Sequence, residues 1–167
     1  VVAFTLTQVQ QEEQRLKEGL EQRSTLLAES LKETVQPNFI NKSDLQLQKL
    51  VDKFEDKQRL AGMAIYDNKG ETIATSSSLI TNVLKTKKIA EDVMDADAAN
   101  GDFVELASEK MYLLAIPLHD EESVVGALMI AQDASFIDTR LNEIWRNNLL
   151  RLFIQASLIS VAILLIL

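Results

Sequence analysis

The chain has 167 residues, of which 25 are acidic and 17 basic, and a formal net charge of −8. This balance argues against nucleic acid as a partner, because phosphate binding requires a basic face. The chain has no Cys and a single His, which excludes disulfides and Cys-ligated metals and argues against a His-based triad or metal site. We expect no metal, no cofactor and no catalytic residue in this segment.

Residues 1–7 are small or apolar and carry no charge. We predict that they form the end of a first transmembrane helix. A cleaved signal peptide is the alternative, although it would leave a more polar terminus than this one.

Residues 8–36 are rich in strong helix formers and predict one long amphipathic helix, which Pro37 and Asn38 are expected to end. Apolar residues recur at alternating steps of four and three, which is the spacing of a coiled-coil seam. The seam residues are Val9, Leu16, Leu20 and Leu27. We favour a homodimer through this helix. The alternative is a monomeric helix whose apolar surface packs only on its own domain.

Residues 37–135 predict a compact α+β core. Ser43 or Asp44 caps a second helix. A hairpin follows, with strands at 63–66 and 71–75 around the turn 67–70. Residues 79–100 read as helix or loop. Three further strands are predicted at 103–107, 111–118 and 124–132. The result is a five-stranded antiparallel sheet with a helical insertion after its second strand.

Residues 136–150 predict a connecting helix that continues into 151–167, the start of a second transmembrane helix. No charge occurs from Leu152 to Leu167. Trp145, Arg146 and Arg151 precede this run, as expected of residues at a membrane interface in contact with lipid. A buried C-terminal helix is the alternative, but it would usually carry a polar stripe.

This order of elements resembles the PAS-like extracytoplasmic sensor domains of the Cache family, also called the PDC fold. Two segments carry the resemblance together with the topology, namely 64–70 in the first hairpin and 116–128 across the last one. Such domains occur in sensor kinases and chemoreceptors.

A closer resemblance involves four segments, at 59–67, 116–119, 133–137 and 144–146. They are similar to the membrane-anchored N-terminal region that precedes a HAMP linker in certain bacterial proteins named trehalose-6-phosphate synthases. The resemblance implies a cytoplasmic glycosyltransferase elsewhere in the full-length protein. It transfers no activity to these residues, which contain no sugar-nucleotide site.

The resemblance also implies a ligand pocket between the sheet and the crossover segment 79–100. The candidate ligand-binding residues are Tyr66, Lys110, Tyr112, Leu114 and His119. Lysines in and near the crossover would favour an anionic small molecule. A filled core without a ligand is the alternative, and His119 is also readily explained as a turn histidine with acidic neighbours.

Together these features predict an extracytoplasmic sensor in a bacterial inner membrane, facing the periplasm or the exterior. Charge does not settle the membrane side, because the loop is long. A ligand or a membrane change would be relayed through paired helices to a cytoplasmic output domain. The alternative function is a structural module that dimerises and anchors the protein and senses nothing.

Overall fold

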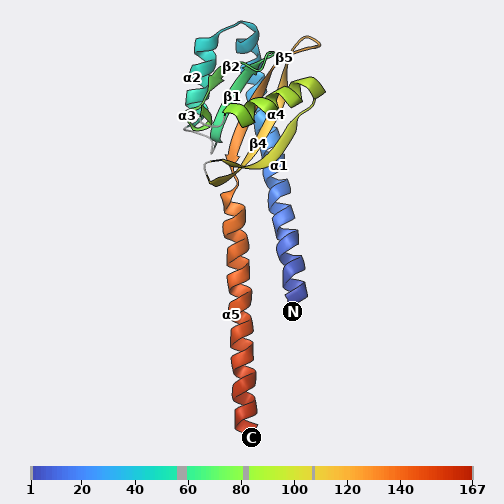
Figure 1. Cartoon of the computed structure of the whole chain (residues 1–167), viewed down its shortest axis with the longest axis vertical. Coiled ribbons are helices and arrows are strands. Elements are labelled where there is room, and N and C mark those ends of the chain that lie inside the picture. The colour runs from blue at the N-terminus through green and yellow to red at the C-terminus, as the bar shows by residue number, and fades with distance from the viewer. Residues whose placement is uncertain (1, 56–59, 81–82, 107, 167) are drawn as a thin grey trace. The chain divides into compact units, whose positions relative to one another are not determined.

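A computed structural model describes residues 2–55, 60–80, 83–106 and 108–166 (Figure 1). The chain divides into two compact units. One is Gly19–Ser135, and the other combines Val1–Glu18 with Phe136–Leu167. The helices are α1 (Val2–Ile40), α2 (Asp44–Glu55), α3 (Ser77–Ile80), α4 (Val83–Ala96) and α5 (Ser135–Ile166).

The Gly19–Ser135 unit is built on a five-stranded antiparallel sheet in the order β2-β1-β5-β4-β3. The strands are β1 (Leu60–Asp67), β2 (Thr72–Thr75), β3 (Asn100–Leu106), β4 (Glu109–Asp120) and β5 (Ser123–Asp133). The predicted α+β class is confirmed, with five antiparallel strands in the predicted order along the chain. Helices α3 and α4 occupy the predicted crossover. The predicted end of the third strand, residue 107, lies outside the described residues.

Two opposite faces of the sheet carry separate cores, because side chains alternate along each strand. In Figure 1, α4 crosses one face and the second half of α1 runs behind the strands. The face under α4 is closed by small side chains that let the helix approach closely. Its buried members are Ala64, Tyr66, Leu79, Ala90, Val93, Leu106, Leu113, Ala115, Ala127, Met129 and Ala131.

The α1 face of the sheet is lined by larger branched side chains. Cross-strand neighbours here are Ile65 with Leu128 and Leu114 with Ile130. A partly buried hydrogen bond joins the helix to the sheet, since Ser24 Oγ donates to Gln132 Oε1 over 2.7 Å. The second half of α1 is therefore part of the sheet unit, while its first half belongs to the other unit.

The end of α1 differs from the prediction. The helix passes through Pro37 and continues to Ile40, so the prediction that Pro37 and Asn38 end it is wrong. Proline removes only one intrahelical donor, and the final turn is closed by other bonds. The N–H of Lys42 donates to the Phe39 carbonyl over 3.0 Å, and the N–H of Ser43 donates to the Asn38 carbonyl over 3.1 Å.

Those two bonds form a Schellman motif, which places the residue after the helix in the left-handed region. Lys42 has a φ of 51°. Three residues separate the end of α1 at Ile40 from the start of α2 at Asp44, and the reversal is made by backbone bonds rather than by the proline.

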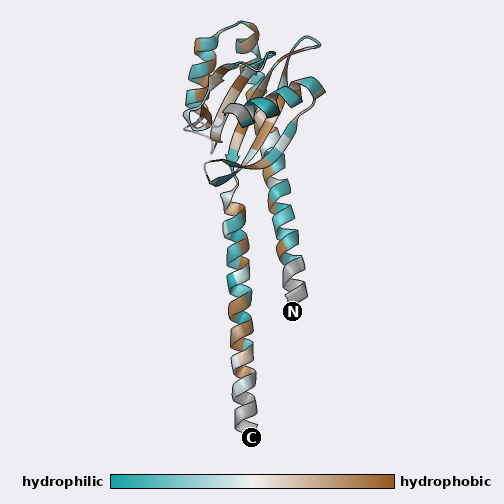
Figure 2. Ribbon diagram, viewed as in Figure 1, coloured by the Kyte–Doolittle hydropathy of each residue, from teal (hydrophilic) through white to brown (hydrophobic). Residues whose placement is uncertain are grey.

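Helix α5 is continuous from Ser135 to Ile166, as the absence of a breaker predicted. Asp133 Oδ1 accepts the N–H of Ser135 over 2.8 Å at its start. Figure 2 shows its surface change from mainly hydrophilic to mainly hydrophobic along the helix. From Leu149 onward, the exposed large apolar residues of this helix are Leu149, Leu150, Phe153, Ile154 and Leu158. Among the described residues, no helix meets the length and hydropathy needed to cross a membrane. The predicted span ends at residues 1 and 167 lie outside the described residues.

Candidate functional site

The predicted ligand residue Tyr66 lies under α4 and is part of the buried core. Its side chain is 1% exposed, and its hydroxyl donates to Thr86 Oγ1 over 2.7 Å. Burial raises the pKa of the Tyr66 hydroxyl, and the bond to Thr86 acts in the opposite direction. The Tyr66 side chain therefore packs between β1 and α4.

Tyr112 and Leu114 lie on the other face of the sheet from Tyr66. The Tyr112 ring packs against Phe103 of β3, with the ring centroids 4.7 Å apart. It also lies over Gly101, where an added Cβ would meet the phenol oxygen. Burial raises the pKa of the Tyr112 hydroxyl, and the carboxylates of Glu21 and Asp102 raise it further.

Lys110 and His119 lie near opposite ends of β4. The Lys110 carbonyl accepts the N–H of Ala134 over 2.8 Å. His119 Nε2 lies 2.7 Å from Asp97 Oδ1, at the end of α4. The structure therefore does not bring the five predicted ligand residues into one pocket, and whether any of them binds a ligand stays a prediction.

The proposed dimer seam runs along a helix that is partly covered by its own chain. Val9 and Leu20 are 8% and 7% exposed, while Leu16 and Leu27 are half-buried. The most exposed apolar side chain of α1 among the described residues is Leu26, at 73%. A partner helix would therefore meet Leu26 more readily than Leu20.

The predicted membrane-interface residues lie near the middle of α5. Arg146 and Arg151 are exposed and Trp145 is half-buried. The two guanidinium groups are therefore accessible to solvent or to a lipid headgroup, whereas the indole is partly covered.

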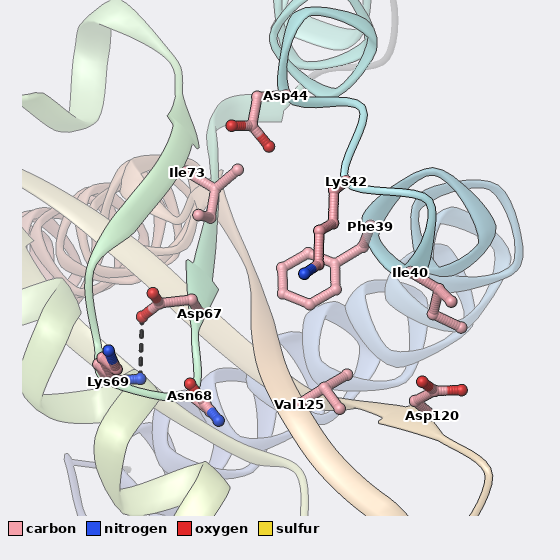
Figure 3. A pocket seen from close by; sticks show the side chains of 10 residues that line it. All are labelled: Phe39, Ile40, Lys42, Asp44, Asp67, Asn68, Lys69, Ile73, Asp120 and Val125. Carbon is pink, nitrogen blue, oxygen red and sulfur yellow. Dashed lines mark hydrogen bonds between the residues drawn. The ribbon is translucent and has the colours of Figure 1, made fainter.

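A pocket of about 490 Å³ lies at one end of the sheet unit (Figure 3). It forms where the end of α1 and the start of α2 meet the β1–β2 turn and the ends of β4 and β5. Its lining combines apolar and charged side chains. The lining residues are Phe39, Ile40, Lys42, Asp44, Asp67, Asn68, Lys69, Ile73, Asp120 and Val125.

The β1–β2 turn on one side of this pocket is held by Asp67. Its Oδ1 accepts the N–H of Lys69 over 2.9 Å and the N–H of Glu71 over 2.8 Å. Gly70 adopts a φ of 72°, which explains why glycine occupies the tightest position of the turn. These hydrogen bonds fix the backbone conformation of the turn, and the Lys69 side chain therefore lies beside the pocket.

The other side of the pocket is made by Phe39 of α1 and the glycine-containing segment of β5. A Cβ added at Gly126 would meet the Tyr66 carbonyl oxygen and lie 2.7 Å from Phe39 Cζ. The absence of a side chain at Gly126 lets the Phe39 ring sit close to the sheet. In Figure 3, the Phe39 ring and the Lys42 side chain project into the middle of the pocket.

Sequence reasoning did not identify this pocket. Asp67, Asn68 and Lys69 were recognised as a turn, and Asp44 was considered only as a helix cap. Lys42 and Asp120 carried no signal of their own, because they are exposed charged residues next to loops. Only the packing of α1 against β5 brings these segments together.

No protein-family model matches this sequence, and no curated protein matches it. Several solved sensor domains are similar in structure. The sensory domain of the Campylobacter jejuni chemoreceptor Tlp3 has a TM-score of 0.59 and 10% identity, covering 81% of this chain and 62% of its own. The same domain has been solved with isoleucine bound and in complex with L-valine.

Two further sensor domains are also similar. The Vibrio cholerae histidine kinase DctB sensor domain has a TM-score of 0.55 and 14% identity, covering 80% of this chain and 58% of its own. The Escherichia coli DcuS sensor domain has a TM-score of 0.53 and 12% identity, covering 77% and 98% respectively. The chain thus spans about three fifths of the Tlp3 and DctB chains. Its long N-terminal helix and five-stranded antiparallel sheet form the α+β fold of PAS-like sensor domains.

Proposed function

We propose that this segment is the signal-sensing domain of a bacterial membrane receptor and relays pocket occupancy through α1. The observation that carries the proposal is that the end of the long helix α1 forms part of the pocket wall. Phe39 and Ile40 line the pocket and are the last residues of a helix that begins at Val2. The structural similarity to sensor domains of chemoreceptors and kinases supports the same assignment.

A ligand in the pocket would contact α1 and the sheet at once. Phe39 belongs to α1 and Val125 to β5, so a bound molecule that draws them together changes how the helix packs on the sheet. Signalling requires two discrete packings with different ligand affinity. The Ser24–Gln132 hydrogen bond and the interlocked apolar side chains make this interface suited to discrete rather than gradual shifts.

Strand β5 provides a second route from the pocket. It lines the pocket at Val125, near its start, and ends at Asp133, whose carboxylate caps the start of α5. A shift of β5 would therefore be transmitted to α5 through covalent connection and this cap.

The finer parts of the proposal concern the whole receptor. We place the domain on the periplasmic or exterior side of the inner membrane and assign a homodimer through α1. Exposed apolar residues of α5, with Arg146 and Arg151 before them, would face lipid. The output would be a HAMP linker followed by an effector, for which the sequence resemblance suggests a trehalose-phosphate-synthase-like glycosyltransferase. We propose no catalytic role for this segment itself.

A second candidate is a dimerisation and anchoring module that binds no ligand. The packing between the sheet and α4 favours this alternative, because Tyr66, Ala90 and Val93 are buried together there. The two candidates differ in whether a change at the pocket alters α1.

The test uses disulfide crosslinking in the full-length receptor in membranes. The segment has no Cys, so Leu26→Cys and Leu16→Cys introduce defined thiols on α1. Each is combined with Val125→Trp, which fills part of the pocket. The relay predicts that the pocket change alters the crosslinking rate at Leu16→Cys at least twofold.

The control is Leu45→Cys, an 81% exposed position on α2 that lies off the proposed seam. It should crosslink poorly with either pocket sequence. If Val125→Trp leaves the crosslinking rate at Leu16→Cys unchanged, the result would favour the anchoring module. The absence of any crosslink along α1 would contradict the proposed homodimer.

A further inference from the structure

The end of β5 lies at a junction that joins both long helices to the sheet. Ser24 of α1 contacts Gln132 there, and the next two residues bond to the starts of α5 and β4. We propose that the hydrogen bond between Ser24 and Gln132 couples α1 to α5, so that the two helices respond together. Both are positioning residues. This inference rests on the proposed sensing function and names the contact that regulates its output.

Ser24 is the polar member of an otherwise apolar row on α1. The row consists of Leu20, Ser24, Ala28, Leu31 and Val35, each at most 7% exposed. Ser24 itself is fully buried. An alanine would suit the helix better and would bring no hydroxyl that requires a partner. Packing alone therefore does not explain a serine at this position.

Gln132 holds the matching position on the sheet. Side chains alternate along β5, so Leu128, Ile130 and Gln132 share the face that α1 covers. The first two are apolar and fully buried, whereas Gln132 is partly buried. Its Oε1 lies 2.7 Å from Ser24 Oγ. Two polar side chains, each in an otherwise apolar row, therefore meet across the helix–sheet interface.

Gln132 is firmly held in the sheet. It belongs to the central strand β5, and its backbone pairs with Leu60 of β1 on one side and with Tyr112 of β4 on the other. A side chain that bonds to Gln132 is therefore tied to three strands at once.

The two residues after Gln132 set the first turn of α5. Asp133 Oδ1 accepts the N–H of Ser135, the first residue of α5, over 2.8 Å. The N–H of Ala134 donates to the Lys110 carbonyl over 2.8 Å. A displacement of Gln132 would therefore alter the bonds from which α5 starts.

The Ser24 hydroxyl has one proton and two acceptors. Besides Gln132 Oε1, the Leu20 carbonyl oxygen lies 2.8 Å from Ser24 Oγ. A hydroxyl donates one hydrogen bond at a time. When α1 moves away from Gln132, the hydroxyl can donate to Leu20, and the partly exposed amide of Gln132 can bond to water. The contact can therefore open without leaving a buried donor unpaired.

The apolar contacts of α1 lack this property. Withdrawing Leu31 or Val35, which are 2% and 0% exposed, would open a cavity or bring apolar surface into water. The contact between Ser24 and Gln132 is thus a part of the interface with two satisfied arrangements, as a two-state relay requires.

The contact joins the two routes that leave the pocket. One route is α1, whose end forms part of the pocket wall, and the other is β5, which lines the pocket at Val125. When Ser24 and Gln132 are bonded, α1 and the end of β5 move together. When the bond is broken, α5 follows β5 alone.

The experiment measures hydrogen exchange by mass spectrometry in the full-length receptor in lipid nanodiscs. Ser24→Ala, Gln132→Met and the double variant each remove the contact with little change in side-chain volume. Peptides covering residues 130–142 should exchange roughly fivefold faster in all three. The double variant should not exceed the single variants, because all three lose the same bond. The reference peptide covers α2 (Asp44–Glu55), which packs on β1 and β2 and should change less than about twofold.

Thermal unfolding separates positioning from general stabilisation. No variant should lower the melting midpoint by more than about 4 °C, because the remaining polar group keeps another partner. The matched control is Thr25→Ala. Thr25 Oγ1 donates to the Glu21 carbonyl over 2.9 Å, much as Ser24 does to Leu20, but the Thr25 side chain is exposed. This control should leave the exchange of residues 130–142 unchanged.

Three results would overturn the inference. They are unchanged exchange of residues 130–142 in Ser24→Ala, an equal increase in the α2 peptide, and a double variant whose increase is the product of the two single increases. The crosslinking assay separates this inference from the relay. Faster local exchange without an effect of Val125→Trp at Leu16→Cys would retain the coupling contact and contradict the relay. Unchanged exchange with a response at Leu16→Cys would contradict the coupling contact and retain the relay.

Discussion

The hydrogen bond between Tyr66 and Thr86 tests whether the crossover face is core. Both side chains are buried, and the bond joins β1 to α4 across the space in which a ligand was first expected. We compare Thr86→Val, Tyr66→Phe and the double variant. Thr86→Val keeps the shape of the side chain and removes the oxygen that accepts the Tyr66 hydroxyl proton.

The magnitudes follow from what each change leaves behind. Thr86→Val leaves a buried phenol hydroxyl without this acceptor, which costs about 1–3 kcal/mol of unfolding free energy. Tyr66→Phe removes the hydroxyl together with its desolvation, while Thr86 retains another interaction, so the cost is about 0.5–1.5 kcal/mol. The double variant should cost little more than Tyr66→Phe alone, so the coupling energy should be close to the Thr86→Val cost, about 1–3 kcal/mol.

The assay is urea denaturation followed by far-ultraviolet circular dichroism. The single Trp, Trp145, belongs to the other compact unit, so its fluorescence would report on the wrong part of the chain. A loss of 2 kcal/mol lowers the midpoint by about 1 M urea when the slope is about 2 kcal/mol/M. The control is Thr72→Val, at an exposed position of β2, which should stay within about 0.5 kcal/mol. Additive costs in the double variant, or a Thr86→Val protein as stable as the control, would refute the reasoning.

Three further predictions concern other parts of the sheet unit. Gly19→Ala should stabilise the protein by about 0.5–1 kcal/mol, because an added Cβ meets nothing within 4 Å. Gly126→Ala should instead destabilise the protein, and by several times that amount, because its Cβ meets the Tyr66 carbonyl oxygen. Equal thermal midpoints of the two variants would contradict this prediction. Burial raises the pKa of the Tyr66 hydroxyl above its ordinary value of 10.0, so the protonated form is favoured in the folded state. The associated stability is complete below pH 10.0 and is lost as the pH rises through the folded-state pKa, and Tyr66→Phe should flatten the stability profile above pH 10.0 in urea titrations. Asp97→Ala and His119→Ala remove one partly exposed contact and should each cost about 0.5–1 kcal/mol in thermal unfolding; clearly different losses would show that one partner has another role.

Much of the fold was predictable because its signals are local. Alternation of apolar residues marked the strands, and 67–70 carried the side chains that a tight turn requires. The crossover and the unbroken α5 followed from helix formers without Gly or Pro. Pro37 was misjudged because a helix can lose one donor when the next residues close its last turn, as Lys42 and Ser43 do.

The candidate site was less predictable, because a strand pattern does not show which face a helix will cover. Tyr66 and Tyr112 have similar sequence surroundings, yet they lie on opposite faces of the sheet. The sequence by itself determined the α+β class, the order of the strands along the chain and the absence of charged residues from Leu152 to Leu167. These features depend on short-range sterics and on composition. The tertiary structure decided that the crossover face is filled and that Phe39, Lys42, Lys69 and Asp120 share a pocket. The physical reason is that a pocket forms between segments that are distant in the sequence and come together only when the chain packs. The free energy of that packing depends on all of these segments at once.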